Sequence, residues 1–195
     1  EGNNHSYRGD ASDDGRYVAF DSFSFQLVPS DTNGRLDIFV RDRDTGTTER
    51  VSVNSSGGQG FGDSLLPSIS ANGRFFAHPP FSTPLLAGDT NTTYDLFVHD
   101  RDNAPTERVS VPDGTGAQAN SSSFHASISN DGRYVAFYSN ATNLVPGDTN
   151  NRPDVFVRDR LTKRTVLASK NSTGEIGDNQ SYLPNISGDG TAVAF

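Results

Sequence analysis

The sequence is built from an internal repeat of 58 to 59 residues, which limits the folds open to this chain more than any other feature. The phrase GRYVAF and its variants begin at four glycines with this spacing: Gly15, Gly73, Gly132 and Gly190. A second phrase, Asp-Thr-Asn followed by an apolar segment, begins with the same spacing at Asp31, Asp89 and Asp148. Units of such an array contact mainly their neighbours, so the sequence predicts stacked copies of one supersecondary structure.

Each phrase of the repeat has the features of a short β-strand. Residues 17–20 form an apolar run directly after an Asp-Gly turn pair, and residues 38–40 are β-branched or aromatic. Residues 51–53 alternate valine with serine, and no segment has an apolar period of 3.6 residues. One repeat therefore predicts four short strands, termed A to D here. Tight turns join A to B and C to D, and longer loops join B to C and D to A.

The repeated phrases resemble the WD40-like (PD40) repeat of TolB-type β-propellers. The phrases that carry this resemblance are Ser12–Phe20, Asp37–Arg43, Thr47–Val53, Ser129–Phe137 and Asp154–Arg160. The resemblance implies an all-β propeller with four-stranded antiparallel blades. It also implies a binding scaffold, or a gating domain attached to a hydrolase.

The number of repeats predicts one partial ring over residues 1–195. The repeat units run approximately over 1–58, 59–117, 118–175 and 176–195, and the fourth holds only its A and B strands. Propellers have about 4–8 blades. We therefore expect the remaining blades to come from a longer chain or from another copy. A piece of a longer propeller is favoured, because repeat arrays need a neighbour or a cap at both ends.

Composition excludes several classes of function. The chain has 16 basic and 24 acidic residues, a net charge of −8, and no cysteine. Nucleic acids and anionic membranes attract basic surfaces, so neither is an expected partner. No apolar run approaches the ~20 residues of a membrane helix. Disulfides and thiolate chemistry are excluded.

The apolar strand residues predict the core between stacked sheets. We expect burial of eleven side chains, which are Tyr17, Val18, Phe20, Ile38, Phe39, Val40, Val135, Phe137, Val155, Phe156 and Val157.

Alternate connections of an antiparallel blade lie at the same end, so the long loops should share one face. The predicted B–C loops are 21–36, 79–94 and 138–153, and the predicted D–A loops are 54–63, 112–122 and 170–180. Long loops on a rigid scaffold are where binding residues concentrate. The opposite end, with its A–B and C–D turns, is expected to be structural.

Each B–C loop carries the pattern Asp-Thr-Asn-x-x-x-Asp. Its acidic and amide residues are Asp31, Asn33, Asp37, Asp89, Asn91, Asp95, Asp148, Asn150 and Asp154. Oxygen ligands at alternating loop positions suit Ca²⁺, which takes six to eight oxygens. The pattern resembles the Asp-x-Asn loops of integrin-type calcium-binding propeller repeats. It departs from them at the fifth position, which is Arg35, Thr93 or Arg152.

The alternative for these loops is structural. Asp and Asn side chains form Asx-turns with their own backbone and order a loop without a metal. The structural turn is favoured, because these residues are common in turns and the pattern guarantees only three side-chain ligands.

No catalytic set stands out. The sequence has no Gly-x-Ser-x-Gly, its carboxylates repeat with the scaffold, and the four histidines (His5, His78, His99 and His125) are expected on the surface or in packing. The repeated Asp-Arg pairs that end each C strand predict salt bridges between blades or within turns.

These features predict a noncatalytic, extracellular or periplasmic module that binds a protein or a glycan on the long-loop face. One alternative is the propeller portion of a larger hydrolase whose catalytic domain lies elsewhere. Another is a structural subunit of an extracellular assembly.

Overall fold

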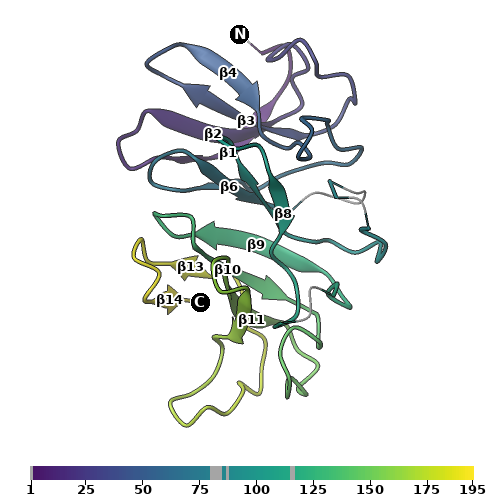
Figure 1. Ribbon diagram of the computed structural model, residues 1–195, viewed down its shortest axis with the longest axis vertical. Coiled ribbons are helices and arrows are strands. Elements are labelled where there is room, and N and C mark those ends of the chain that lie inside the picture. Colours follow the sequence, from purple (N-terminus) through teal and green to yellow (C-terminus); the bar gives the residue numbers. More distant parts are fainter. Residues whose placement is uncertain (1, 80–84, 87, 115–116) are drawn as a thin grey trace.

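The computed structural model describes residues 2–79, 85–86, 88–114 and 117–195, and these residues form strands, turns and loops with no helix. The predicted loops 79–94 and 112–122 lie partly outside the described residues. The predicted all-β fold of four-stranded sheets is confirmed (Figure 1). No described segment is a helix that could cross a membrane.

Each of the first three repeats forms one antiparallel sheet in the order A-B-C-D. The first sheet contains β1 (Ser6–Ala11), β2 (Tyr17–Ser22), β3 (Asp37–Asp42) and β4 (Thr47–Arg50). The second contains β5 (Ser68–Ile69), β6 (Phe75–His78), β7 (Phe97–Asp100) and β8 (Thr106–Arg108). The third contains β9 (Ser123–Ile128), β10 (Tyr134–Ser139), β11 (Asp154–Asp159) and β12 (Arg164–Leu167). The fourth repeat supplies β13 (Asn185–Ile186) and β14 (Val193–Ala194).

The sheets stack along the molecule, and their A strands β1, β5, β9 and β13 lie next to one another in sequence order (Figure 1). Side chains at one register position link them. Asp10, Ser68 and Ser127 each accept a hydrogen bond from a backbone N–H of the next A strand, at 3.0, 3.2 and 3.1 Å. The A strands are therefore the inner strands of the stack.

The core lies between the sheets. Phe76 of β6 packs against Ile38 and Val40 of β3, whereas Val98 of β7 packs against the third sheet with Val135 and Phe137.

Seven of the eleven predicted core side chains are buried: Ile38, Phe39, Val40, Val135, Phe137, Val155 and Phe156. Tyr17, Val18, Phe20 and Val157 are only half-buried, which corrects the prediction for these four. Val157 shows the reason. It occupies the register position of Val40, which the second sheet covers, but the described fourth sheet has no C strand to cover Val157.

The end with the A–B and C–D turns is built the same way in each of the first three repeats. Arg16 at the start of the B strand makes a two-bonded ion pair with Asp42 at the end of the C strand, and Asp42 also accepts the N–H of the following turn. The pairs Arg74–Asp100 and Arg133–Asp159 repeat this arrangement. These aspartates order the turns within one blade, which is one of the two roles predicted for the Asp-Arg pairs.

In the second and third repeats, the arginine after this aspartate links neighbouring blades. Arg101 pairs with Glu49 of the first repeat at 2.5 Å, and its guanidinium lies 4.3 Å from the centre of the Tyr17 ring. Gly73 in the A–B turn of the second repeat lies directly on this ring. Arg160, Phe75 and Gly132 form the next copy of the stack. Because these turn glycines have no side chain, a ring from the preceding blade can lie directly against them. The sequence pattern predicted the turns but not this packing role.

Candidate functional site

The inner strands share an irregularity near their first residues. In β1 and β9, two residues lie opposite one residue of the neighbouring strand, which makes a bulge at residues 7–8 and 125–126. His125 in this bulge has a φ of 51°, and the residues at its position in the second and fourth repeats, Leu66 and Leu183, have φ values of 55° and 52°. Bulky residues avoid this left-handed region, and bulges re-aim side chains next to functional sites. The same backbone strain in three repeats indicates that this end of the inner strands is a candidate functional region.

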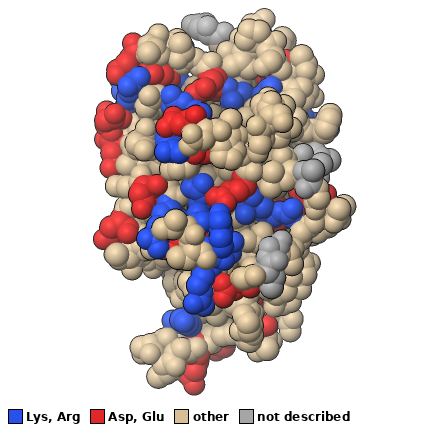
Figure 2. Space-filling view, in the orientation of Figure 1, with Lys and Arg blue, Asp and Glu red and all other residues tan. Residues whose placement is uncertain are grey.

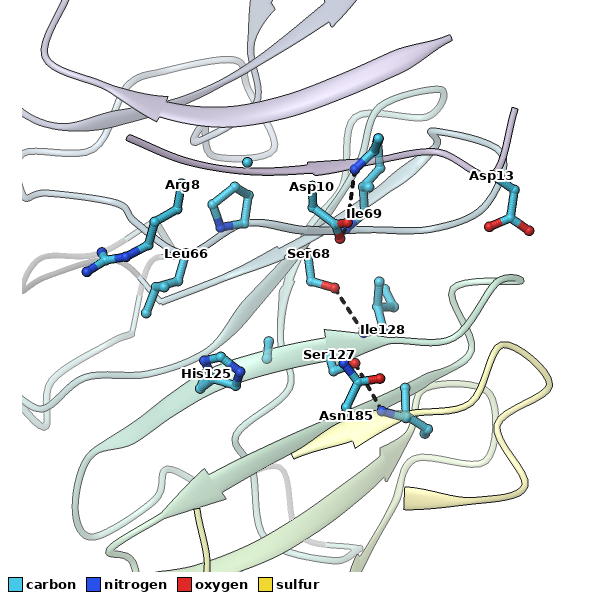
Figure 3. A pocket seen from close by; sticks show the side chains of 15 residues that line it. Arg8, Asp10, Asp13, Leu66, Ser68, Ile69, His125, Ser127, Ile128 and Asn185 are labelled. Carbon is cyan, nitrogen blue, oxygen red and sulfur yellow. Dashed lines mark hydrogen bonds between the residues drawn. The ribbon is translucent and has the colours of Figure 1, made fainter. Parts of the chain in front are cut away.

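The inner strands line an axial cavity of about 400 Å³. Figure 3 shows Arg8, Leu66 and His125 at one end of this cavity and Asp13 at the other. The Asp10, Ser68 and Ser127 side chains, with the hydrogen bonds that join the strands, lie between them (Figure 3). The cavity therefore offers mainly polar groups, several of which are already paired.

A second cavity, of about 270 Å³, adjoins the first at Leu66 and His125 and lies at the long-loop end. Its walls are apolar and aromatic: Leu65, Leu66, Pro79, Tyr94, Phe124, His125, Tyr138 and Leu183. We call it the aromatic cavity. Burial raises the pKa of Tyr138 and lowers the pKa of His125, so both side chains are neutral at pH 7.

Four rings run in a row along the aromatic cavity. Their centroids are 5.1 Å apart for Tyr94 and Phe124, 5.4 Å for Phe124 and Tyr138, and 5.1 Å for Tyr138 and Tyr182. Tyr182 is 40% exposed and Leu183 is 64% exposed, so the row reaches the surface. Aromatic rings in a recess with few polar groups are typical of ligand sites.

The Asp-Thr-Asn loops contain the predicted Asx-turns. Asn33, Asn91 and Asn150 each accept, through Oδ1, the N–H of the residue two positions later, at 2.9, 3.1 and 2.9 Å. Their Nδ2 atoms donate to Asp37, Asp95 and Asp154 at 2.9, 3.1 and 2.8 Å. The same nitrogens donate to backbone carbonyls of the following D–A loop. The predicted Asx-turns are therefore confirmed, whereas Ca²⁺ binding by these loops stays a prediction.

The carboxylates of these loops are mostly buried. Asp31, Asp37, Asp95, Asp148 and Asp154 are all buried, and Asp89 is half-buried. Burial raises the pKa of Asp31, Asp37, Asp95 and Asp148 above the ordinary value. Within the described residues, no three His, Asp or Glu side chains come close enough together to form a metal site.

The histidines do not come together as one site. His99 hydrogen-bonds Thr106 at 2.9 Å, in the place where Arg158 of the third sheet bonds Thr165. His78 is fully buried, and neither of its ring nitrogens has a hydrogen-bond partner in the part of the chain that the structure describes. His78 and His99 are packing residues, as predicted, whereas His125 lines both cavities.

Charges of both signs alternate over the face shown in Figure 2, and ion pairs join many of them. Arg160 and Lys163 both pair with Glu107, at 2.5 and 2.8 Å. The candidate functional site is therefore the pair of cavities along the inner strands, and not the charged surface of this face.

The sequence predicted that the long loops lie together at one end, but it did not predict the aromatic cavity. Three of its wall residues, Leu66, His125 and Leu183, occupy one register position, which Arg8 holds in the first repeat. This variation within an otherwise repeated phrase was the available signal.

Comparisons with known proteins agree with this architecture. No family model and no curated protein matches the chain. Among solved structures, TolB from Acinetobacter baumannii matches with a TM-score of 0.60 at 17% identity, over 98% of this chain and 37% of that protein. A putative TolB from Agrobacterium tumefaciens matches with a TM-score of 0.51 at 17% identity, over 84% of this chain and 48% of that protein.

A protease domain has a similar fold. The β-propeller domain of the Trilobed protease from Pyrococcus furiosus matches with a TM-score of 0.51 at 10% identity, over 84% of this chain and 41% of that chain. The chain thus spans less than half the length of each of these proteins. At these identities the likeness concerns the fold alone. The chain therefore has a β-propeller fold, and its described residues form three four-stranded blades and two strands of a fourth.

Proposed function

We propose that this chain is a noncatalytic β-propeller module that binds a protein or glycan ligand at the long-loop end, in an extracellular or periplasmic location. The observation that carries the proposal is the aromatic cavity, with its row of rings from Tyr94 to Tyr182. Flat rings present a large contact area at low cost in side-chain entropy, which suits both a sugar face and an apolar peptide side chain. The adjoining axial cavity supplies polar groups that would fix the orientation of the ligand.

Tyrosine fluorescence offers a direct test. The chain has six tyrosines and no tryptophan, and Tyr94, Tyr138 and Tyr182 all belong to the row of rings. We would screen glycan and peptide arrays and then titrate each hit against the purified protein. The expected result is a saturable change in tyrosine emission.

Variants separate the aromatic cavity from the rest of the surface. Tyr138→Ala removes a cavity wall and should weaken binding about tenfold, since stacking and burial of one ring contribute roughly 1–2 kcal/mol. Leu161→Ala is the control, because Leu161 is 72% exposed in a turn at the opposite end. Equal affinities of the two variants would contradict the proposed site. Fractionation of cells that express the complete gene tests the location.

The propeller portion of a larger hydrolase is a second candidate, because the Trilobed protease propeller and the tricorn protease, with a TM-score of 0.53, share the fold. In that case the ligand would be a substrate, and the complete gene product would cleave it. A structural subunit of an extracellular assembly would instead bind other copies of itself, which sedimentation of the purified chain would detect.

A further inference from the structure

In each of the first two repeats, an arginine at the end of the D strand lies between two carboxylates of the B–C loop. One guanidinium nitrogen of Arg50 lies 3.5 Å from Asp31 and 3.7 Å from Asp37. In the second repeat, one nitrogen of Arg108 lies 3.7 Å from Asp89 and 3.0 Å from Asp95. In both loops a cationic atom thus lies within 4 Å of both carboxylates.

A glutamine completes each of these two loops. Gln59 accepts a hydrogen bond from Arg50 at 2.7 Å and exchanges hydrogen bonds with Thr32 of the Asp-Thr-Asn phrase. Gln118 makes the corresponding bonds to Thr90 in the second repeat. The first two loops are therefore closed by a polar pair from the D strand and the D–A loop.

The third repeat has lost this pair. Leu167 occupies the register position of Arg50, because Leu167 faces Phe156 as Arg50 faces Phe39. Ile176 replaces Gln59, since both residues form the same bridge at the start of the D–A loop. The rest of the loop is unchanged. Asp154 accepts hydrogen bonds from Asn150 at 2.8 Å and from Ser169 at 2.6 Å.

Asp148 is left without a partner. It is 7% exposed, and neither carboxylate oxygen is accessible or has a hydrogen-bond partner among the described residues. No described lysine or arginine lies within ion-pair distance of it. A buried ionised carboxylate costs several kcal/mol unless it is paired.

We propose that the third B–C loop binds an inorganic divalent cation, with Ca²⁺ as the probe, between Asp148 and Asp154, at the place that a guanidinium nitrogen occupies in the first two loops. Two carboxylates balance the charge of one divalent ion, and backbone carbonyls with water complete the oxygen shell that Ca²⁺ requires. The Asx-turn of Asn150 holds the loop in shape without the ion. This inference does not depend on the proposed ligand site.

A cavity of about 340 Å³ adjoins the loop and offers a route for the ion. Gly147, the residue before Asp148, lines it together with Leu167 and Ile176. The small side chains at these positions leave space that an arginine and a glutamine fill in the first two repeats. Arg164 and Lys170 also line this cavity. Arg164 already pairs with Asp113 at 3.3 Å, so Lys170 is the competing cation that an experiment has to exclude.

Calorimetric titration of the metal-free chain with Ca²⁺ tests the proposal. The expected result is one Ca²⁺ per chain, rather than the three that equal loops would give. Asp148→Asn should weaken binding at least tenfold, whereas the matched variant Asp31→Asn should leave it unchanged. Because Arg50 already occupies the first loop, the double variant Arg50→Leu with Gln59→Ile should add a second Ca²⁺ per chain.

Leu167→Arg with Ile176→Gln restores the polar pair in the third repeat and should abolish Ca²⁺ binding while the chain stays folded. Thermal denaturation should show Ca²⁺ raising the melting temperature of the wild type but not of this variant, because an ion that binds only the folded state stabilises it. Absence of Ca²⁺ binding by the wild type would overturn the proposal. So would a loss of stability in Lys170→Ala that Ca²⁺ does not restore, since Lys170 would then be the counter-ion of Asp148.

Discussion

The two ends of this propeller differ in how strictly they repeat. At the short-turn end, an Arg–Asp pair orders the turn in each of the three four-stranded blades. In the second, third and fourth repeats, a ring from the preceding blade lies on the turn glycine. At the long-loop end, corresponding positions hold different residues, such as Arg8 and His125, and they surround cavities. The difference indicates that the short-turn end holds the blades together, whereas the long-loop end is free to specialise.

The largest expected effect concerns the short-turn glycines. A Cβ added at Gly132 would lie 2.0 Å from the Phe75 ring, and the φ of Gly132 is 73°. Gly132→Ala should therefore lower the free energy of unfolding by about 3 kcal/mol, through backbone strain and overpacking between two blades.

Gly15→Ala is the matched control, measured by urea denaturation beside Gly132→Ala. Gly15 has a φ of 67°, but the nearest atom to its added Cβ is an arginine nitrogen at 3.6 Å. Only the strain of about 1 kcal/mol should remain. Equal losses in the two variants would mean that the ring contact does not hold the blades together.

A buried histidine at the long-loop end, where the other repeats have phenylalanine, should make the free energy of unfolding depend on pH. His78 lies at the position of Phe20 and Phe137, and complete burial lowers its pKa to about 3 from an ordinary 6.5. Between these pH values the unfolded chain binds a proton that the folded chain does not. Stability is therefore lost as the pH falls from 6.5 towards 3, by on the order of 3 kcal/mol between pH 7 and pH 4.

His78→Phe restores the repeat and should remove this part of the acid sensitivity, as measured by urea denaturation at a series of pH values. Phe137→His is the reciprocal variant and should introduce a similar loss in the third blade. If the pH dependence of His78→Phe matched that of the wild type, the buried histidine would not be its source.

A smaller effect is expected for one ion pair of the short-turn end. The guanidinium of Arg74 holds the pKa of Asp100 well below its usual range, so the stabilisation is present above the unfolded pKa and is lost as the pH falls through the acid range. Asp100→Asn should cost about 1 kcal/mol at pH 7, because Arg74 is one-third exposed and solvent screens the pair. Chemical denaturation at pH 7 would show this loss, and a loss above 3 kcal/mol would contradict the screening argument.

The smallest expected effect is a gain at the long-loop end. Leu183 has a φ of 52° and is 64% exposed, so its side chain contributes little burial while its backbone is strained. Leu183→Asn should raise the free energy of unfolding by about 0.5 kcal/mol, because asparagine tolerates the left-handed region. Thermal denaturation measures this gain, and a clear loss of stability would show that Leu183 packs more than its exposure indicates.

The sequence by itself determined the repeat length, the four-stranded unit and the end that carries the long loops. These follow from spacing and from local strand and turn chemistry, which act within one unit: Asp14-Gly15 forms its turn and Asn33 its Asx-turn with neighbouring residues alone. The burial of Ile38 and Phe156 could be predicted from the apolar strand pattern, because each lies on a strand face that packs against a neighbouring sheet.

Only the tertiary structure decided what the units do to one another. Tyr17 lies on Gly73 of the next repeat, and the aromatic cavity draws its walls from the second, third and fourth repeats. Nor did the pattern Asp-Thr-Asn distinguish Asp31 from Asp148. Asp31 has an ion-pair partner because Arg50 lies at the end of its D strand, whereas the corresponding D-strand residue in the third repeat is Leu167. Contacts between segments that are distant in the chain depend on how the sheets stack. A local sequence pattern does not predict that stacking.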